Sequence, residues 1–459
     1  MDTTGYTPEE PIAAIATALA PAALGIIRCS GKGCFELVSK IFSRPKTLLN
    51  APGNTIVYGW IVDSSEETLK RIDEVLLNVF RGPKSFTGED MIEINCHGGP
   101  AVITEIFRLL TENGFRSANK GEFTFRAFIN GKADLTQAEA IHEIISAKTD
   151  ESRSRAAGRL AGNLYDRIDS IKTKLITVLA SIEAEIEYPE DEETIADAFD
   201  DSELRVVQQE LKDLCDSWAS EKLYQDGARI ILCGKTNAGK SSLFNTLLKE
   251  ERAIVSDIHG TTRDWIESWI SFAGIPARLF DTAGLRQTED VIEQHGVQRT
   301  LDLTEDADLM LYVVDSTQGL SKEDSEFLEK QTAPVVLVLN KSDISNSVLN
   351  IQTKNPVVKI SAKTGEGVGR LTEVVRDILA SSATSERNLP GLGSVRQKQC
   401  AQNALESVSH GLEASEDGYT LDAVVQDIED ALDFLGEITG NVTPEDILDT
   451  VFSRFCLGK

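Results

Sequence analysis

Residues 234–241 read Gly-Lys-Thr-Asn-Ala-Gly-Lys-Ser, a spacing typical of a loop that binds nucleotide phosphates. The glycines let backbone N–H groups turn inward around a β-phosphate with no Cβ in the way. Lys240 supplies a cation for the β- and γ-oxygens, and the Ser241 hydroxyl can ligate Mg²⁺. Apolar residues 228–233 predict a buried strand before the loop, and residues 242–248 predict a helix after it. The segment therefore predicts chemistry on a nucleoside triphosphate.

Three further motifs follow this loop, each directly after an apolar run that predicts a strand. They are Asp281-Thr282-Ala283-Gly284 after 277–280, Asn340-Lys341-Ser342-Asp343 after 334–339, and Ser361-Ala362-Lys363 after 357–360. Asp281 is expected near the metal and Gly284 near the γ-phosphate. The Asp343 carboxylate can accept both N1–H and N2–H of guanine, whereas adenine offers neither donor and would leave that acceptor unpaired. Four motifs in this order predict a guanine-nucleotide hydrolase.

The sequence lacks the glutamine that usually orients the attacking water. Leu285 stands where Ras-like proteins place a glutamine that orients water, and leucine cannot polarise anything. The nearest acidic side chains are Glu289, Asp290 and Glu293. Asn237, inside the phosphate loop, could ligate a monovalent cation that supplies the positive charge of an arginine finger. It could equally be a loop residue that bonds to its own backbone.

Composition restricts the class of protein and its partners. The chain has 459 residues, enough for about three domains, and a formal net charge of −28, which repels nucleic acid in bulk. Its 7 cysteines form no Cys-x-x-Cys pair, which favours a reducing cytoplasm over disulfides or zinc. The apolar stretch 11–27 follows acidic residues and contains Pro21, so it is interpreted as a strand or core segment and no membrane contact is expected.

A cluster of basic residues offers one place where RNA could still be contacted. It comprises Lys148, Arg153, Arg155, Arg159, Arg167, Lys172 and Lys174. At helical spacing Arg155 and Arg159 share one face. A solvated helix face is the favoured interpretation of this cluster, and an RNA contact is the other.

The distribution of patterns predicts an α/β multidomain protein in four segments. Residues 1–131 form an α+β domain, 132–223 a first helical segment, 224–383 a P-loop Ras-like nucleotide domain with a parallel sheet, and 384–459 a second helical segment. The simplest architecture inserts the nucleotide domain into one helical domain, because neither helical segment makes a large core alone. The acidic stretch 183–203 is expected to be a solvated loop.

Motifs along the whole chain resemble the MnmE (TrmE) family of tRNA-modification GTPases. They comprise Gly25-Ile26-Ile27-Arg28, Ser85-Phe86-Thr87-Gly88-Glu89-Asp90, His97-Gly98-Gly99-Pro100, Gly121-Glu122-Phe123, Asp134 to Ala140, the phosphate loop, Gly260-Thr261-Thr262-Arg263-Asp264, Asp281 to Arg286 and the ending Phe455-Cys456-Leu457-Gly458-Lys459. The resemblance implies a cytoplasmic homodimer that forms a heterotetramer with the flavin-dependent protein MnmG, which carries FAD. Together they would add a carboxymethylaminomethyl or aminomethyl group to C5 of the wobble uridine of certain tRNAs. The one-carbon unit would come from a tetrahydrofolate derivative in the N-terminal domain.

The resemblance also implies roles for individual residues. Arg28, Glu93 and Lys132 match folate contacts; Asn237, Ser256, Ile258 and Thr261 match K⁺ ligands; Ser241 and Thr262 match Mg²⁺ ligands. Glu293 matches the glutamate that orients water, so Glu293 and Lys240 are the expected catalytic residues. The full set expected to bind GTP or GDP is Asn237, Ala238, Gly239, Lys240, Ser241, Ser242, Ser256, Asp257, Ile258, His259, Gly260, Thr261, Thr262, Asp281, Thr282, Ala283, Gly284, Asn340, Lys341, Asp343, Ser361, Ala362 and Lys363. In this view, K⁺-dependent pairing of two nucleotide domains activates hydrolysis.

Some positions depart from the family pattern, and one alternative function stays open. His259 stands where a small residue is common in the potassium loop, and Asn119-Lys120 replaces Arg-Pro before Gly-Glu-Phe. Cys456 and Lys459 end the chain; Cys456 is interpreted either as a participant in modification chemistry or as an exposed thiol. The alternative is a GTP-switched ribosome or RNA assembly factor without one-carbon chemistry. Tetrahydrofolate bound to residues 1–131 would separate the two.

Overall fold

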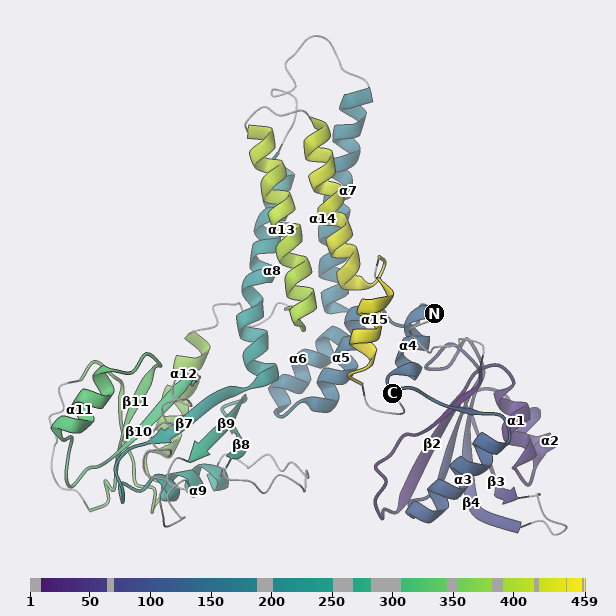
Figure 1. The fold of residues 1–459 in the computed structure, drawn as a ribbon, viewed down its shortest axis with the longest axis horizontal. Coiled ribbons are helices and arrows are strands. Elements are labelled where there is room, and N and C mark those ends of the chain that lie inside the picture. The colour runs from purple at the N-terminus through teal and green to yellow at the C-terminus, as the bar shows by residue number, and fades with distance from the viewer. Residues whose placement is uncertain are drawn as a thin grey trace. The chain divides into compact units, whose positions relative to one another are not determined.

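The computed structural model describes residues 10–63, 70–187, 201–250, 267–281, 307–344, 353–381, 391–416, 421–442, 444–455 and 458. The chain divides into two compact units (Figure 1). Unit 1 comprises residues 1–142 and 433–459, and unit 2 comprises residues 143–432.

Unit 1 is built on a six-stranded sheet with the strand order β3-β4-β5-β2-β1-β6. The strands are β1 (Ile12–Ile15), β2 (Leu24–Ser30), β3 (Thr55–Asp63), β4 (Lys70–Phe80), β5 (Met91–His97) and β6 (Arg116–Ser117). The helices are α1 (Cys34–Lys40), α2 (Pro45–Leu49), α3 (Pro100–Glu112), α4 (Glu122–Ile129), α5 (Leu135–Ser146), which runs on into unit 2, and α15 (Glu445–Phe452). The apolar stretch 11–27 supplies β1 and the first half of β2, which confirms its interpretation as strand and core.

The two faces of this sheet differ in how far they are covered. Val75 and Leu77 on β4 pack with Ile103 and Ile106 of α3 in a common core, because alternate residues of a strand point to one face. The other face carries large apolar side chains that stay exposed: Leu24 (65%), Ile56 (66%), Tyr58 (48%) and Leu76 (45%). One face of the sheet is therefore covered, whereas the other has a smaller buried cluster around Ile12, Met91 and Phe123 and is exposed at these four residues.

Residues near the end of the chain also belong to unit 1, although the sequence grouped all of 384–459 with the helical segments. Phe452 of α15 is fully buried. Its ring centroid lies 5.4 Å from that of Phe125 and 5.5 Å from that of Phe455. Aromatic pairs at these distances add to the stability gained from burying their area.

Unit 2 contains long helices and the nucleotide domain. The helices are α6 (Asp150–Leu160), α7 (Asn163–Glu187), α8 (Ser202–Asp226), α13 (Val395–Glu416) and α14 (Leu421–Thr439), the last of which ends in unit 1. Helix α13 packs along α8, as expected if the two helical segments form one domain (Figure 1). Residues 183–187 and 202–203 of the acidic stretch are helical, so the expected loop 183–203 is wrong at both ends. Glutamate favours helix, which accounts for the difference.

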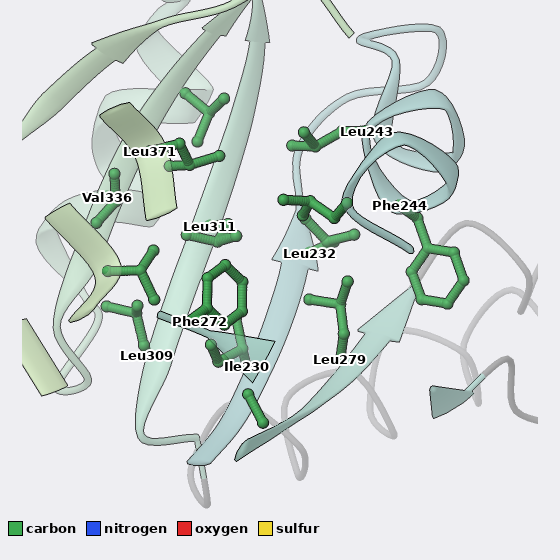
Figure 2. Close-up of a cluster of buried hydrophobic side chains, with 14 of the residues drawn as sticks. Ile230, Leu232, Leu243, Phe244, Phe272, Leu279, Leu309, Leu311, Val336 and Leu371 are labelled. Atoms are coloured by element: carbon green, nitrogen blue, oxygen red, sulfur yellow. The ribbon is translucent and has the colours of Figure 1, made fainter. Parts of the chain in front are cut away.

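The nucleotide domain has a second six-stranded sheet with the order β12-β11-β10-β7-β9-β8. Its elements are β7 (Ala228–Cys233), α9 (Lys240–Glu250), β8 (Glu267–Phe272), β9 (Ile275–Asp281), β10 (Leu309–Asp315), α11 (Lys322–Glu329), β11 (Val335–Asn340), β12 (Val357–Lys359) and α12 (Val368–Ser381). All pairings are parallel except β8 with β9, which confirms the predicted parallel sheet. Figure 2 shows the core between the sheet and its helices, where Leu232 and Leu311 meet Leu243 and Leu371.

Arg155 and Arg159 share one face of α6, as predicted, but that face is buried rather than solvated. Arg159 is 2% exposed and donates to Glu221 at 2.7 Å and to Glu143 at 2.5 Å. Arg155 donates to the other oxygen of Glu221 at 2.7 Å. The interpretation as a solvated helix face is therefore wrong, because a long-range ion network buries Arg159 and leaves the Arg155 side chain 15% exposed.

In the part of the chain that the structure describes, no helix combines the length and the apolar character that crossing a membrane requires.

Candidate functional site

The predicted phosphate loop connects β7 to α9, and two of its glycines cannot be replaced without a clash. Gly234 has φ of +129°, and a Cβ there would lie 2.1 Å from the carbonyl oxygen of Val313. Gly239 has φ of +95°, and its Cβ would lie 2.1 Å from the Asn340 side-chain nitrogen. Only glycine permits this backbone conformation and this close approach. The loop is thus seated between the ends of β10 and β11.

The last two residues of the motif, Lys240 and Ser241, are the ones expected to serve phosphate and metal chemistry. The Lys240 ammonium is largely buried and donates to the carbonyls of Gly234 at 2.9 Å and Lys235 at 2.8 Å. The Ser241 hydroxyl donates to Oδ2 of Asp281 at 2.9 Å. A hydroxyl and a carboxylate oxygen in contact are a donor set that suits Mg²⁺. The structure therefore brings together three of the predicted site residues.

The motifs expected to recognise the base are connected to the phosphate loop through one buried side chain. The Asn340 amide donates to the carbonyl of Ala238 at 2.9 Å. Its oxygen accepts from the backbone N–H of Lys341 at 2.8 Å and of Ala362 at 2.9 Å. The Ser361 hydroxyl donates to Asp343 at 2.8 Å, which orients that carboxylate. These contacts join three motifs that are far apart in the sequence.

Sequence reasoning missed two residues that support this loop system. Thr246 of α9 donates to the carbonyl of Ala362 at 2.7 Å. Lys235 of the phosphate loop donates to the Ser321 hydroxyl at 2.6 Å and lies 3.6 Å from the buried Asp324. Ser321 and Asp324 form a capping box at the start of α11, and the Ser-x-x-Asp pattern was the available signal for that helix start. No sequence signal pointed to Thr246.

In unit 1, Arg28 and Glu93 lie side by side on β2 and β5. Arg28 Nε is 3.1 Å from a Glu93 oxygen, and the Arg28 guanidinium lies 4.9 Å from the centroid of the Phe86 ring and 5.1 Å from that of Phe123. Burial lowers the pKa of Arg28, and Glu93 opposes that shift only in part. Because Glu93 compensates the buried Arg28 charge only in part, a further anionic or polar partner could bind there favourably.

Lys132 and the end of the chain approach the same region. Lys132 Nζ donates to the carbonyl of Pro83 at 3.1 Å, in the loop that also carries Phe86. Arg28 Nη1 donates to the carbonyl of Gly458 at 3.2 Å, although the two residues are 430 positions apart. Arg28 and Lys132 thus contact one loop, through Phe86 and Pro83, while Glu93 and Gly458 both contact Arg28.

Comparison with known proteins places this geometry in a family. The model of the MnmE helical domain matches residues 135–456, and the model of the GTP-binding protein TrmE N-terminus matches residues 11–132. The tRNA modification GTPase MnmE of Treponema denticola is 53% identical over 99% of both chains, and that of Treponema pallidum is 40% identical over 99% of both. The chain belongs to the MnmE family. It is a GTP hydrolase that acts in tRNA modification.

Two solved structures match parts of this chain with low TM-scores. A single-residue variant of Aquifex aeolicus Era bound to GDP·AlF₄⁻ is 25% identical and covers 39% of this chain and 66% of its own, with a TM-score of 0.27. The G domain of the FeoB iron transporter from Thermotoga maritima is 28% identical and covers 34% of this chain and 99% of its own, with a TM-score of 0.25. Membership of the MnmE family rests on the full-length relatives.

Several residues that the MnmE resemblance singled out lie outside the described residues. They are Ser256, Asp257, Ile258, His259, Gly260, Thr261, Thr262, Thr282, Ala283, Gly284, Glu293, Cys456 and Lys459. Of the expected K⁺ ligands, Asn237 is described: it is exposed and has φ of +63°. This left-handed conformation is one that asparagine tolerates better than most residues.

Proposed function

We propose that this MnmE-family chain is a K⁺-dependent GTPase that works as a homodimer with MnmG. Together they would add a carboxymethylaminomethyl or aminomethyl group to C5 of the wobble uridine in certain tRNAs, in the cytoplasm. The observation that carries this proposal is the Arg28–Glu93 pair in unit 1. Arg28 is 8% exposed, and burying a charge is costly unless its partners compensate it. A chain that only switched between nucleotide states would have no use for such a site.

The chemistry of this site suits a tetrahydrofolate derivative, which when bound would supply the one-carbon unit. The Glu93 carboxylate can accept from the N–H groups of the pterin, as an aspartate does from guanine. The Lys132 side chain is exposed and can pair with a carboxylate of the glutamate tail. Phe86 and Phe123 hold the Arg28 guanidinium through its contact with their rings.

In the nucleotide domain, each residue would have a distinct part in hydrolysis. Lys240 neutralises charge on the β- and γ-phosphate oxygens as the bond to the leaving group breaks. Ser241 and Thr262 would hold Mg²⁺, with Asp281 beside Ser241 near the metal, and Asp343 would select guanine. Glu293 would orient the attacking water, and Asn237 would ligate K⁺, which takes the place of an arginine finger.

The exposed part of the second sheet face in unit 1 supports self-association. Leu24, Ile56, Tyr58 and Leu76 are between 45% and 66% exposed on that face. Large apolar side chains gathered on one face are typical of a surface that another protein covers. A second copy of this chain is the partner that the homodimer proposal requires.

Ligand binding by matched variants tests the folate site. Arg28→Met should lose most affinity for 5-formyltetrahydrofolate in calorimetry, while its GTPase rate stays within twofold of the parent. Arg71→Met is the control, because Arg71 is an exposed arginine of the same sheet that lies over Trp60 at 5.0 Å. Equal folate affinity in the two variants would contradict the assignment of Arg28.

Two further measurements test the activity itself. GTP hydrolysis should be faster in K⁺ than in Na⁺ and nearly abolished in Glu293→Ala; equal rates in the two salts would remove the cation role of Asn237. Mass spectrometry of tRNA nucleosides from cells without the protein should show loss of the modified wobble uridine. If modification is normal and folate does not bind, the assembly-factor alternative replaces this proposal.

A further inference from the structure

Asp315 ends β10 beside the loop that carries the guanine-recognition motif. It is the register partner of Asn340, the last residue of the neighbouring parallel strand β11. The Ser316 backbone N–H donates to the carbonyl of Asn340 at 2.9 Å. Asp315 Oδ2 accepts a hydrogen bond from Lys341 Nζ at 2.6 Å. A carboxylate from one strand end thus holds the residue that follows the next strand end.

Contacts other than that with Lys341 also fix the orientation of the Asp315 carboxylate. Its other oxygen, Oδ1, accepts from the backbone N–H of Thr317 at 2.9 Å and from the Thr317 hydroxyl at 2.7 Å. Its side chain is 10% exposed. Burial alone would raise the pKa of Asp315, yet the hydrogen bonds from Lys341 and Thr317 hold it below the usual range. Asp315 is therefore an oriented anion at neutral pH.

Lys341 needs such an anchor because of its backbone conformation. Its φ is +67°, in the left-handed region that lysine rarely adopts. The turn that it starts leads within two residues to Asp343, the expected acceptor of guanine N–H groups. Such strained backbone conformations persist only where surrounding contacts hold them in place. The contact with Asp315 and the N–H bond to the Asn340 side chain are two such determinants.

We propose that Asp315 is a positioning residue for guanine recognition: by holding the Lys341 ammonium it fixes the turn that presents Asp343 to the base. The inference depends on the GTPase activity and on the base-recognition motif, and not on folate or K⁺. It assigns to Asp315 an effect on nucleotide affinity and base discrimination, with none on the chemical step.

Steady-state kinetics and binding on the full-length protein test this role. Asp315→Asn should raise the KM for GTP and the Kd for GDP about tenfold, a change of ~1.4 kcal/mol. Its kcat at saturating GTP should stay within twofold. Affinity for ITP, which lacks the 2-amino donor, should fall less than affinity for GTP, because ITP makes one fewer bond to Asp343. The control is Glu373→Gln, which breaks the exposed Arg370–Glu373 pair of the same domain and should change nothing.

A double-mutant cycle separates positioning from general stability. In a Lys341→Met background, Asp315→Asn should change the KM less than twofold, because its partner is already gone. Additive effects, an unchanged KM, or a lower kcat at unchanged KM would each overturn the proposal. If Asp315→Asn does not fold, Thr317→Val removes one orienting bond and should raise the KM two- to threefold; no change in that variant would also overturn it.

Discussion

The buried ion network of unit 2 makes a quantitative stability prediction. We expect Arg159→Met to destabilise unit 2 by about 3 kcal/mol. Removing one partner of a buried ion pair typically costs about 3 to 5 kcal/mol, because the remaining charge stays out of water. The lower end applies here because Glu221 keeps its 2.7 Å hydrogen bond from Arg155, whereas Glu143 loses both of its contacts with Arg159.

The same helix offers a matched control. Arg153 of α6 pairs with Asp150 at 2.7 Å, but the two side chains are 54% and 87% exposed. Exposed pairs contribute about 0 to 1 kcal/mol, so Arg153→Met should change stability by less than about 0.5 kcal/mol. The loss of stability in Arg159→Lys should lie between those of the two methionine variants. Lysine keeps the charge but lacks the planar guanidinium that reaches both carboxylates.

Thermal unfolding followed by circular dichroism measures the difference. For a unit of this size, 1 kcal/mol corresponds to a shift of about 2 to 4 °C. Arg159→Met should therefore lower the Tm by about 6 to 12 °C and Arg153→Met by at most about 1 to 2 °C. If the two methionine variants unfold within 2 °C of each other, the network contributes no more than an exposed pair and the reasoning fails.

Three other changes have expected outcomes. Gly239→Ala should abolish measurable GDP binding in calorimetry, because its Cβ would lie 2.1 Å from the Asn340 side chain; retained affinity would show that the loop can move. Phe452→Ala should destabilise unit 1 by about 3 to 5 kcal/mol in urea unfolding, since the ring is fully buried; a loss below 1 kcal/mol would contradict that packing. The hydrogen bond to Asp73 and its charge raise the pKa of His97 above 6.5. The resulting stabilisation should be complete below pH 6.5 and disappear as pH rises through the folded-state pKa. NMR titration should show this shift and its loss in Asp73→Asn.

The sequence predicted which motifs of the nucleotide domain lie together, because their signal is local. Each motif follows a short apolar run, and the carboxyl ends of parallel strands meet at one edge of the sheet. That rule placed Asp281 beside Ser241 and Asn340 beside the phosphate loop. The same rule, applied to the apolar run that ends at Asp315, would have identified that residue too.

Contacts between distant segments were not predictable in this way. The carbonyl of Gly458 meets Arg28 across 430 positions, and Glu221 meets Arg155 and Arg159 across 66 and 62. Neither kind of contact leaves a periodic pattern in the sequence, because each needs only one residue on either side. The basic cluster was therefore interpreted by charge alone, and the acidic residues that neutralise it could not be located.

Two buried arginines of this chain, Arg159 and Arg28, show how a structural charge differs from a functional one. Arg159 bonds to two carboxylates, and although burial lowers its pKa, Glu143 and Glu221 raise it to a net value above normal. Among the described residues, Arg28 pairs with the single carboxylate of Glu93, and its pKa stays below normal. The carboxylates around Arg159 thus favour its charged form more strongly than Glu93 favours that of Arg28. A bound ligand that presents an anionic or acceptor group would complete the compensation at Arg28, which is why the folate proposal rests on that residue.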